Sequence, residues 1–145
     1  LARALHAGTI GGAALDVTDP DSIKTAIAST LEKFGRIDVV VNNAGDNDSA
    51  SLEAGPEAFR KSLERNLFHA FDLAHFALPH LKASRGCVLN ISSMAGVTGQ
   101  ERHAIYGATK GAINALTRAG TSARNTFNVP ATPPRAVMRS AWRAG

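Results

Sequence analysis

The sequence predicts a three-layer, doubly wound α/β fold, in which helices cover a parallel β-sheet. Segments typical of strands alternate along the chain with segments of helical periodicity. The strand predicted at residues 37–42 is rich in β-branched residues, as expected for a strand buried on both faces of a parallel sheet. Small or polar residues end each predicted strand, and ligands of such sheets bind at the carboxyl ends of the strands.

A helix is predicted between two strands in the first third of the chain. Asp19 suits the N-cap of this helix, Pro20 suits its first position, and Gly35 suits its end. The two flanking strands are predicted at residues 11–17 and 37–42.

The middle of the chain predicts a long helix over about residues 56–83. Pro56 can open this helix, and apolar residues recur along one of its sides. A strand at 86–92, a glycine-containing loop at 93–103 and a helix at about 104–119 follow.

Composition and charge are those of an ordinary globular protein. Of the 145 residues, 44% are hydrophobic and 19% are charged, and no apolar stretch is long enough to suggest a membrane span. The net charge of +4 comes from residues 118–145, which read as an irregular, solvated tail rather than a polyanion-binding arm. No nucleic-acid motif is present, so no nucleic-acid partner is expected. The single cysteine, Cys87, excludes an internal disulfide and fits a cytoplasmic location.

The only tyrosine of the chain, Tyr106, is followed four residues later by Lys110. Residues at this spacing share one face of a helix, so the two side chains can approach each other. An ammonium about 4 Å from a phenolate can lower the tyrosine pKa by about three units, which makes the pair a candidate general acid/base. A half-buried aromatic beside a solvated lysine is the simpler alternative, because this spacing alone is a weak signal.

Two further polar residues are expected at the same edge of the sheet. Ser93 stands at the end of a predicted strand, where its hydroxyl can bond a substrate oxygen or, alternatively, satisfy loop backbone groups. Asn66 faces the apolar side of the long helix, where a buried amide must find partners. It is either a satisfied core asparagine or a polar relay beside the site.

In combination, these residues resemble the short-chain dehydrogenase/reductase family, whose sheet is Rossmann-like. The matching motifs, in order and at the family's usual spacings, are "DVTD" at 16–19, "NNAG" at 42–45, Asn66 in "LERNL", "NISS" at 90–93 and "YGATK" at 106–110. The likeness covers about residues 10–118. The stretches "SLERNL", "PHLKASRG" and "TGQ" look like the branch that contains L-fucose and related aldose dehydrogenases.

The resemblance implies an oxidoreductase that passes a hydride between NAD or NADP and an alcohol or carbonyl substrate, such as the sugar L-fucose. Tyr106 would be the acid/base, and Lys110 would lower its pKa and bind the nicotinamide ribose. Ser93 would orient the substrate, Asn66 would hold a proton-relay water, and Gln100 would reach a sugar hydroxyl.

The resemblance also implies which residues line the cofactor. Asp16 and Val17 would meet the adenine. The turn after the second strand would lie along the cofactor through Asn43, Ala44 and Gly45, whose small side chains let a flat ligand approach the backbone.

Two parts of the family's pattern are expected outside this sequence. The Gly-rich turn that seats the pyrophosphate, and the residue that separates NAD from NADP, are expected upstream. At the other end, "RNTFNVPATPP" echoes the family's continuation without its Pro-Gly, and the two strands that follow in the family are expected to be missing. Residues 1–118 are therefore expected to be a partial domain, truncated at both ends, with an irregular basic tail at 119–145. Family members usually pair through the helices at 56–83 and 104–119, so a homo-oligomer is expected of the intact protein. A non-catalytic α/β fragment or interaction module is the alternative.

Overall fold

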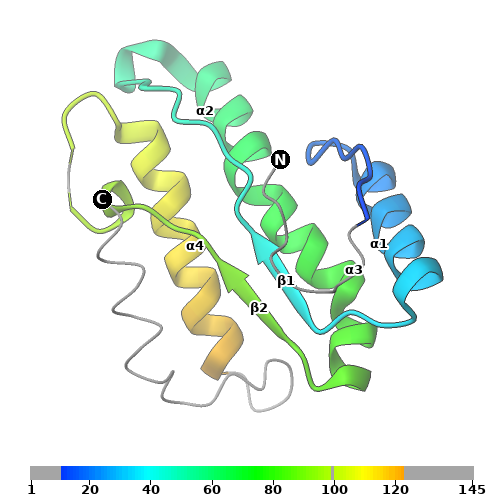
Figure 1. Ribbon diagram of the computed structural model, residues 1–145. Helices are drawn as coiled ribbons and strands as arrows, with labels where there is room; N and C mark the ends of the chain where they lie inside the picture. The colour runs from blue at the N-terminus through cyan, green and yellow to red at the C-terminus, as the bar shows by residue number, and fades with distance from the viewer. Residues whose placement is uncertain (1–10, 99, 123–145) are drawn as a thin grey trace.

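The computed structural model describes residues 11–98 and 100–122 (Figure 1). The elements in chain order are α1 (Pro20–Phe34), β1 (Val39–Asn42), η1 (Leu52–Ala54), α2 (Gly55–Leu63), η2 (Glu64–Phe68), α3 (His69–Ser84), β2 (Cys87–Asn90), η3 (Met94–Gly96) and α4 (Ala104–Ser122). Of the short elements, η1 and η3 are 3₁₀ turns and η2 is a π-helical turn that joins α2 to α3.

The two described strands form a parallel pair. Val39 lies opposite Cys87, and the register continues to Asn42 opposite Asn90. Figure 1 shows both arrows running toward the same end of the molecule, where α4 begins. The predicted α/β fold with a parallel sheet is therefore confirmed, and the carboxyl ends of both strands meet at one edge.

The described helices that pack on the sheet lie on one of its faces. Val40 and Asn42 point to this face and are 8% and 4% exposed. Val39 and Val41 point to the other face and are 52% and 51% exposed. The described residues thus form two of the three predicted layers. The expected burial of β1 on both faces is not seen, because no described helix covers the second face.

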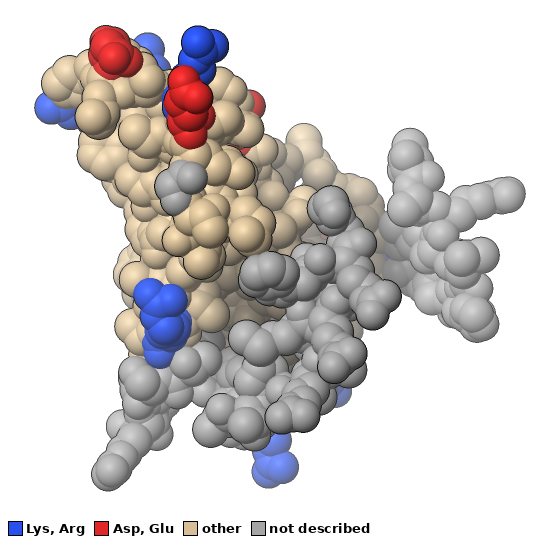
Figure 2. All heavy atoms as spheres, turned by 90° about the vertical axis from the view of Figure 1, so that its left-hand side faces the viewer, with Lys and Arg blue, Asp and Glu red and all other residues tan. Residues whose placement is uncertain are grey.

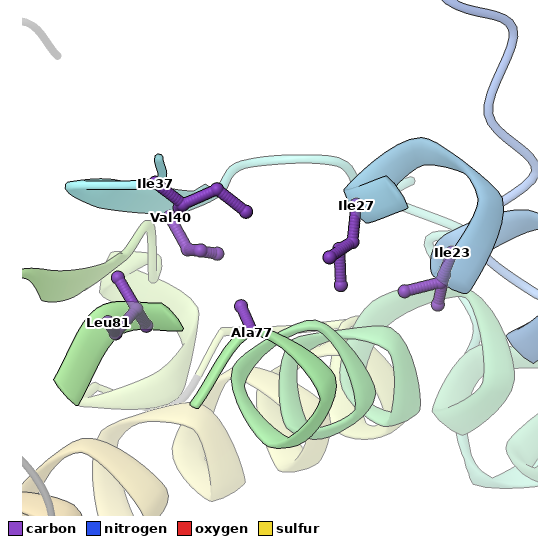
Figure 3. Packing of buried hydrophobic residues seen from close by; sticks show 6 residues of the cluster. All are labelled: Ile23, Ile27, Ile37, Val40, Ala77 and Leu81. Atoms are coloured by element: carbon purple, nitrogen blue, oxygen red, sulfur yellow. The ribbon is translucent and has the colours of Figure 1, made fainter. Parts of the chain in front are cut away.

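The apolar core lies between the strands and helices α1 and α3. Figure 3 shows side chains from α1 pointing toward side chains of α3 and of the segment around β1. The cluster consists of Ile23, Ile27, Ile37, Val40, Ala77 and Leu81. Burying such side chains is the main source of stability in a small domain, at about 25 cal/mol for each Å² of apolar surface.

Helix α1 has the boundaries and caps that the sequence predicts. The side chain of Asp19 accepts a hydrogen bond from the backbone N–H of Asp21 at 3.0 Å, and Pro20 is the first helical residue. Gly35 ends the helix in the left-handed conformation, with φ of 75°, and donates its N–H to the oxygen of Leu31. Both caps satisfy backbone groups that a helix end leaves without partners.

The prediction of a strand at residues 11–17 is wrong for the structure as described. Residues 11–16 belong to no strand or helix, and the two described strands pair with each other. A strand is held by hydrogen bonds to a neighbouring strand, so an apolar segment alone does not make one.

The long predicted helix is present, but it is not uniform. It runs from Gly55 to Ser84 through the π-helical turn Glu64–Phe68, and Arg85 ends it with φ of 57°. The inserted turn shifts the helical register at Asn66, and such turns are frequent at functional sites.

The last strand and the last helix lie where the sequence predicts them, but their bounds differ from the predicted ones. The strand predicted at 86–92 is Cys87–Asn90, in which Cys87 is half-buried. Helix α4 continues to Ser122, so the first residues of the predicted tail are helical, and the rest of that tail lies outside the described residues. None of the described helices is long and apolar enough to cross a membrane, and the cytoplasmic location stays a prediction.

Figure 2 looks onto the side of the molecule at the left of Figure 1, and few of the described residues visible there are charged. Figure 2 shows acidic and basic groups side by side at the upper end of this face, with a mostly uncharged described surface below them. The helices 55–84 also expose apolar rings, with Phe68 and Phe71 at 50% and 56%.

Candidate active site

Tyr106 and Lys110 share one face of α4, one turn apart. The Nζ atom of Lys110 lies 5.7 Å from the centroid of the Tyr106 ring. The lysine is only 5% exposed, and its Nζ donates a hydrogen bond to the backbone oxygen of Ile91 at 3.1 Å. The approach of the two side chains agrees with the predicted helical spacing, and the lysine is buried rather than solvated.

Burial lowers the pKa of Lys110 below its ordinary value of 10.5, because the charged amine loses hydration. The hydrogen bond from Nζ to the backbone oxygen of Ile91 holds the ammonium next to the carboxyl end of β2. The protein therefore holds a poorly hydrated cation one helical turn from a phenol.

Residues that follow β2 pack directly onto this part of α4. Ser92 donates its hydroxyl to the backbone oxygen of Lys110 at 3.1 Å. A Cβ on Gly96 would lie 2.5 Å from the carbonyl carbon of Lys110 and 2.7 Å from the nitrogen of Gly111, so only glycine permits this approach. The turn η3 is therefore held against the helix that carries Tyr106.

Ser93 lies at the predicted strand end and caps η3. Its Oγ accepts a hydrogen bond from the N–H of Ala95 at 3.2 Å, which is the backbone role that the simpler interpretation foresaw. A hydroxyl that accepts one hydrogen bond can still donate its own proton. The half-buried Ser93 thus keeps a donor for a second group.

Asn66 joins the π-helical turn to the chain that follows β1. Its Oδ1 accepts the N–H of Asp46 at 2.7 Å, and its Nδ2 donates to Ser62 Oγ at 3.2 Å. It is 1% exposed, so both bonds offset the cost of burying an amide. A second link to the same segment is the ion pair of Arg65 with Asp46 at 3.1 Å.

Gly45 lies close to both Asn66 and Lys110. A Cβ at this position would lie 2.9 Å from Asn66 Oδ1 and 3.5 Å from Lys110 Nζ. The three residues Asn43, Ala44 and Gly45 are exposed, so a ligand can reach them. An open backbone with small side chains fits the flat ligand expected at this turn.

A line of amides crosses the strand ends beneath this turn. Asn42 Nδ2 donates to the oxygen of Ala70 at 3.1 Å and to Asn90 Oδ1 at 2.7 Å. Asn90 Nδ2 in turn donates to Thr117 Oγ1 at 2.9 Å. These bonds tie β1, β2, α3 and α4 together below the predicted site residues.

The sequence reasoning missed His69. This residue is 2% exposed at the start of α3, and burial, together with the nearby charge of Lys110, lowers its pKa below the ordinary 6.5. Its position three residues after Asn66, on the same side of the helix, was the available signal.

Asp16 and Val17 lie before the amino end of α1. Asp16 Oδ1 accepts the backbone N–H and the hydroxyl of Thr18 at 2.8 and 2.7 Å, and these bonds lower the pKa of the exposed Asp16 carboxyl. In Figure 1, α1 starts at the same end of the molecule as the carboxyl ends of the strands. The recorded bonds of Asp16 are local and do not reach Tyr106.

Gln100 lies in the loop between η3 and α4. It is exposed, and its backbone oxygen accepts the N–H of His103 at 3.3 Å. Among the described contacts, none joins its side chain to Ser93 or Tyr106.

Comparisons with known proteins identify the family. The model of the family described as short chain dehydrogenase matches residues 2–132. L-fucose dehydrogenase from Rattus norvegicus is 46% identical over 106 residues, which cover 72% of this chain and 39% of that protein. The chain thus spans about two fifths of the length of this curated relative.

Solved structures agree with this assignment. The crystal structure of Cj0485 dehydrogenase has a TM-score of 0.70 at 36% identity, and the match covers 72% of this chain and 41% of that one. ElxO with NADP bound has a TM-score of 0.67 at 37% identity, with 74% and 45% covered. The chain belongs to the short-chain dehydrogenase family.

Proposed function

We propose that the gene product containing this chain is an NAD- or NADP-dependent oxidoreductase acting on an alcohol or carbonyl group, with Tyr106 as the acid/base. The observation that carries the proposal is the buried Lys110, whose Nζ lies 5.7 Å from the Tyr106 ring at the carboxyl ends of the strands. The NADP in the ElxO structure supports the choice of cofactor.

The residues of this chain handle the proton and the orientation of the substrate. When the substrate is a carbonyl, its oxygen accepts the proton of the Tyr106 hydroxyl, and the reverse transfer serves an alcohol. The ammonium of Lys110 favours the phenolate that this transfer leaves behind. The remaining donor of Ser93 can hold the same substrate oxygen. The nicotinamide ring, when bound, supplies or accepts the hydride.

The turn at 42–45 would hold the cofactor, and Asn66 would hold the proton-relay water. Both side-chain atoms of Asn66 can make one hydrogen bond beyond those recorded, so the predicted relay water is compatible with its position. The open backbone of Asn43, Ala44 and Gly45 would lie along the cofactor. Lys110 would also bind the nicotinamide ribose.

The adenine end of the cofactor would lie near the start of α1. Asp16 and Val17, which precede this helix, would contact the adenine, and the Asp16 carboxylate accepts two bonds from Thr18 that hold it in place.

A sugar is the substrate class that the relatives favour. L-fucose dehydrogenase from Rattus norvegicus shares 46% of the aligned residues with this chain. The exposed Gln100, in the loop after Ser93, would bond a hydroxyl of such a substrate through its amide.

The decisive experiment follows nicotinamide absorbance with the complete gene product, L-fucose, and either NAD or NADP. Replacing the only tyrosine by Tyr106→Phe removes the proton donor with little change in shape, so the rate should fall about 10²- to 10⁴-fold. The matched control is Ser29→Ala, which removes an exposed hydroxyl from α1 and should leave the rate unchanged.

Two outcomes separate the alternatives. An unchanged rate in Tyr106→Phe would remove the tyrosine from the reaction. An absence of turnover with every sugar and alcohol tested would favour the non-catalytic interaction module instead.

We also propose that the intact protein is a homo-oligomer that pairs through α2–α3 and α4. The exposed rings of Phe68 and Phe71, at 50% and 56%, support this surface. Analytical ultracentrifugation of Phe71→Asp should show a shift toward monomer, and an unchanged sedimentation coefficient would exclude this face.

A further inference from the structure

The loop that follows β1 is anchored at both of its ends, each time on a different helical element. Residues 46–50, here called the 46–50 loop, belong to no helix or strand and are exposed or half-buried throughout. The first residue, Asp46, contacts the π-helical turn, and the last, Ala50, contacts the start of α4. A loop with so little buried surface keeps one conformation only where such contacts fix it.

Two neighbouring residues of the π-helical turn hold Asp46. Asn66 Oδ1 accepts its backbone N–H at 2.7 Å, and Arg65 Nη1 donates to its Oδ2 at 3.1 Å. Arg65 is itself held on the helix, because its Nε donates to the backbone oxygen of Lys61 at 3.4 Å. A guanidinium that is oriented in this way loses less conformational freedom for each hydrogen bond that it forms. Asp46 is therefore held by its backbone and by its carboxylate.

The side chains of the 46–50 loop stiffen it from within. Asn47 Oδ1 accepts the N–H of Ser49 at 3.2 Å, and Asp48 Oδ1 accepts the N–H of Ala50 at 3.3 Å. Bonds of this kind, from a side chain to the backbone two residues on, close short turns. The backbone of Ser49, with φ of 47°, is in the left-handed region. The loop is thus a series of short turns, so a displacement of Asp46 is passed on to Ala50.

The far end of the 46–50 loop holds the first turn of α4. The backbone oxygen of Ala50 accepts the N–H of Ile105 at 3.3 Å. Helix α4 begins at Ala104, so this N–H lies in the first turn, where a helix supplies no acceptor of its own. Ile105 is 5% exposed, and a buried backbone N–H requires a partner. Tyr106 is the next residue, so the loop holds the turn that carries the proposed acid/base.

We propose that Arg65 is a positioning residue, whose ion pair with Asp46 fixes the 46–50 loop and thereby the first turn of α4. The recorded contacts of the Arg65 side chain are with Asp46 and Lys61, so it acts on Tyr106 only through the loop. The consequence for catalysis rests on the proposed function, because it requires Tyr106 as the acid/base. The coupling between the loop and α4 is a property of the folded chain and can be measured without turnover.

Two substitutions remove the ion pair from its two sides. Arg65→Gln removes the cation, and Asp46→Asn removes the anion but keeps the backbone N–H that Asn66 accepts. The double variant should resemble either single one, because each of them already breaks the pair. The matched control is Arg60→Gln on the neighbouring helix α2, since Arg60 is exposed and its pairing with Glu57 at 3.8 Å stays within that helix.

Amide hydrogen exchange of the complete gene product, followed by NMR, tests the coupling without activity. The N–H of Ile105 should exchange about threefold faster in Arg65→Gln and in Asp46→Asn than in the wild type, because an exposed ion pair shifts an equilibrium by at most about fivefold. Ile113, buried further along α4 at 3% exposure, should exchange at the wild-type rate, and Arg60→Gln should change neither amide. Unchanged exchange at Ile105 would overturn the proposal, as would equal acceleration at Ile105 and Ile113.

The kinetic test uses the same proteins with L-fucose and either NAD or NADP. Arg65→Gln should lower kcat about threefold with the cofactor KM changed less than about 1.5-fold, since the Asn66 bond still holds Asp46 beside the turn at 42–45. The side chains of the pair are 46% and 59% exposed, so the difference from the wild type should shrink between about 0.05 M and about 1 M salt. A difference that salt leaves unchanged would overturn the ion pair as the cause. Faster exchange at Ile105 with an unchanged kcat would support the coupling and count against the proposed function.

Discussion

The side-chain oxygen of Asn66 accepts the backbone N–H of Asp46 at 2.7 Å, although the two residues are 20 positions apart in the chain. This bond joins the π-helical turn between α2 and α3 to the segment that follows β1. The same asparagine donates to Ser62 within its own helix, so each end of the amide has a partner at its place beside Gly45. Its side chain therefore fixes the turn whether or not it also holds a water.

Asn66→Leu should destabilise the fold by about 1–3 kcal/mol. The substitution leaves the Asp46 N–H and the buried Ser62 hydroxyl without their partner, and an unsatisfied buried group costs about that much. Urea denaturation measures the loss. Asn43→Ala is the control, because Asn43 is exposed, and its effect should stay within about 0.5 kcal/mol. Equal stabilities of the two variants would show that the hydrogen bonds of Asn66 make no net contribution to the free energy of unfolding.

Gly96→Ala should separate η3 from α4 and cost at least about 1–3 kcal/mol. The new methyl group would lie 2.5 Å from the carbonyl carbon of Lys110, and the backbone of a helix cannot move aside as a flexible side chain can. Gly12→Ala is the matched control, since no atom lies within 4 Å of a Cβ there. The melting temperature should fall for the first variant only, and tolerance of both would contradict the close packing.

Lys110→Met should raise the stability at neutral pH by about 1 kcal/mol while it abolishes turnover. Burial disfavours the charged amine, and methionine fills a similar volume without a charge. Lys24→Met is the control with the opposite sign, because Lys24 is exposed and pairs with Asp21 at 2.9 Å, a contact whose loss should lower the stability slightly. A marked loss of stability in Lys110→Met would mean that its bond to Ile91 outweighs the cost of burial.

Local signals in the sequence predicted the helices well. The cap of α1 depends on Asp19, Pro20 and Gly35, which act within one turn of the residues they stabilise, so a short segment contains the whole cause. The strand predicted at 11–17 failed for the opposite reason. Its composition suits a strand, but a ladder requires a partner that is distant in the sequence.

In the candidate site, too, some features could be predicted from the sequence and others could not. The i, i+4 spacing of Tyr106 and Lys110 predicted their approach, and α4 shows it at 5.7 Å. The π-helical turn at Asn66 was not predictable, because a single extra residue in a helical turn leaves no mark in an apolar stripe. His69 was passed over because a lone histidine beside an apolar face is ordinary in a sequence, and only the folded structure shows its burial near the charge of Lys110.

The last prediction concerns the pH dependence of stability, which His69 should dominate in mildly acidic solution. Its folded pKa lies below the ordinary 6.5, so between these two values the unfolded chain binds more protons than the folded one. Stability must then rise with pH across this window, and it is lost as the pH falls from 6.5 toward the folded pKa. The contribution of one such group is at most about 1.4 kcal/mol for each pH unit.

His69→Gln provides the comparison, because glutamine is polar like histidine but cannot take up a proton there. Urea unfolding of the wild type and of His69→Gln, at several pH values between about 5 and 7.5, should give a steeper decline for the wild type. Since both proteins share every carboxylate, acid effects such as protonation of Asp16 cancel in the difference. Parallel curves would show that His69 is as easily protonated in the folded chain as in the unfolded one, which would contradict the prediction.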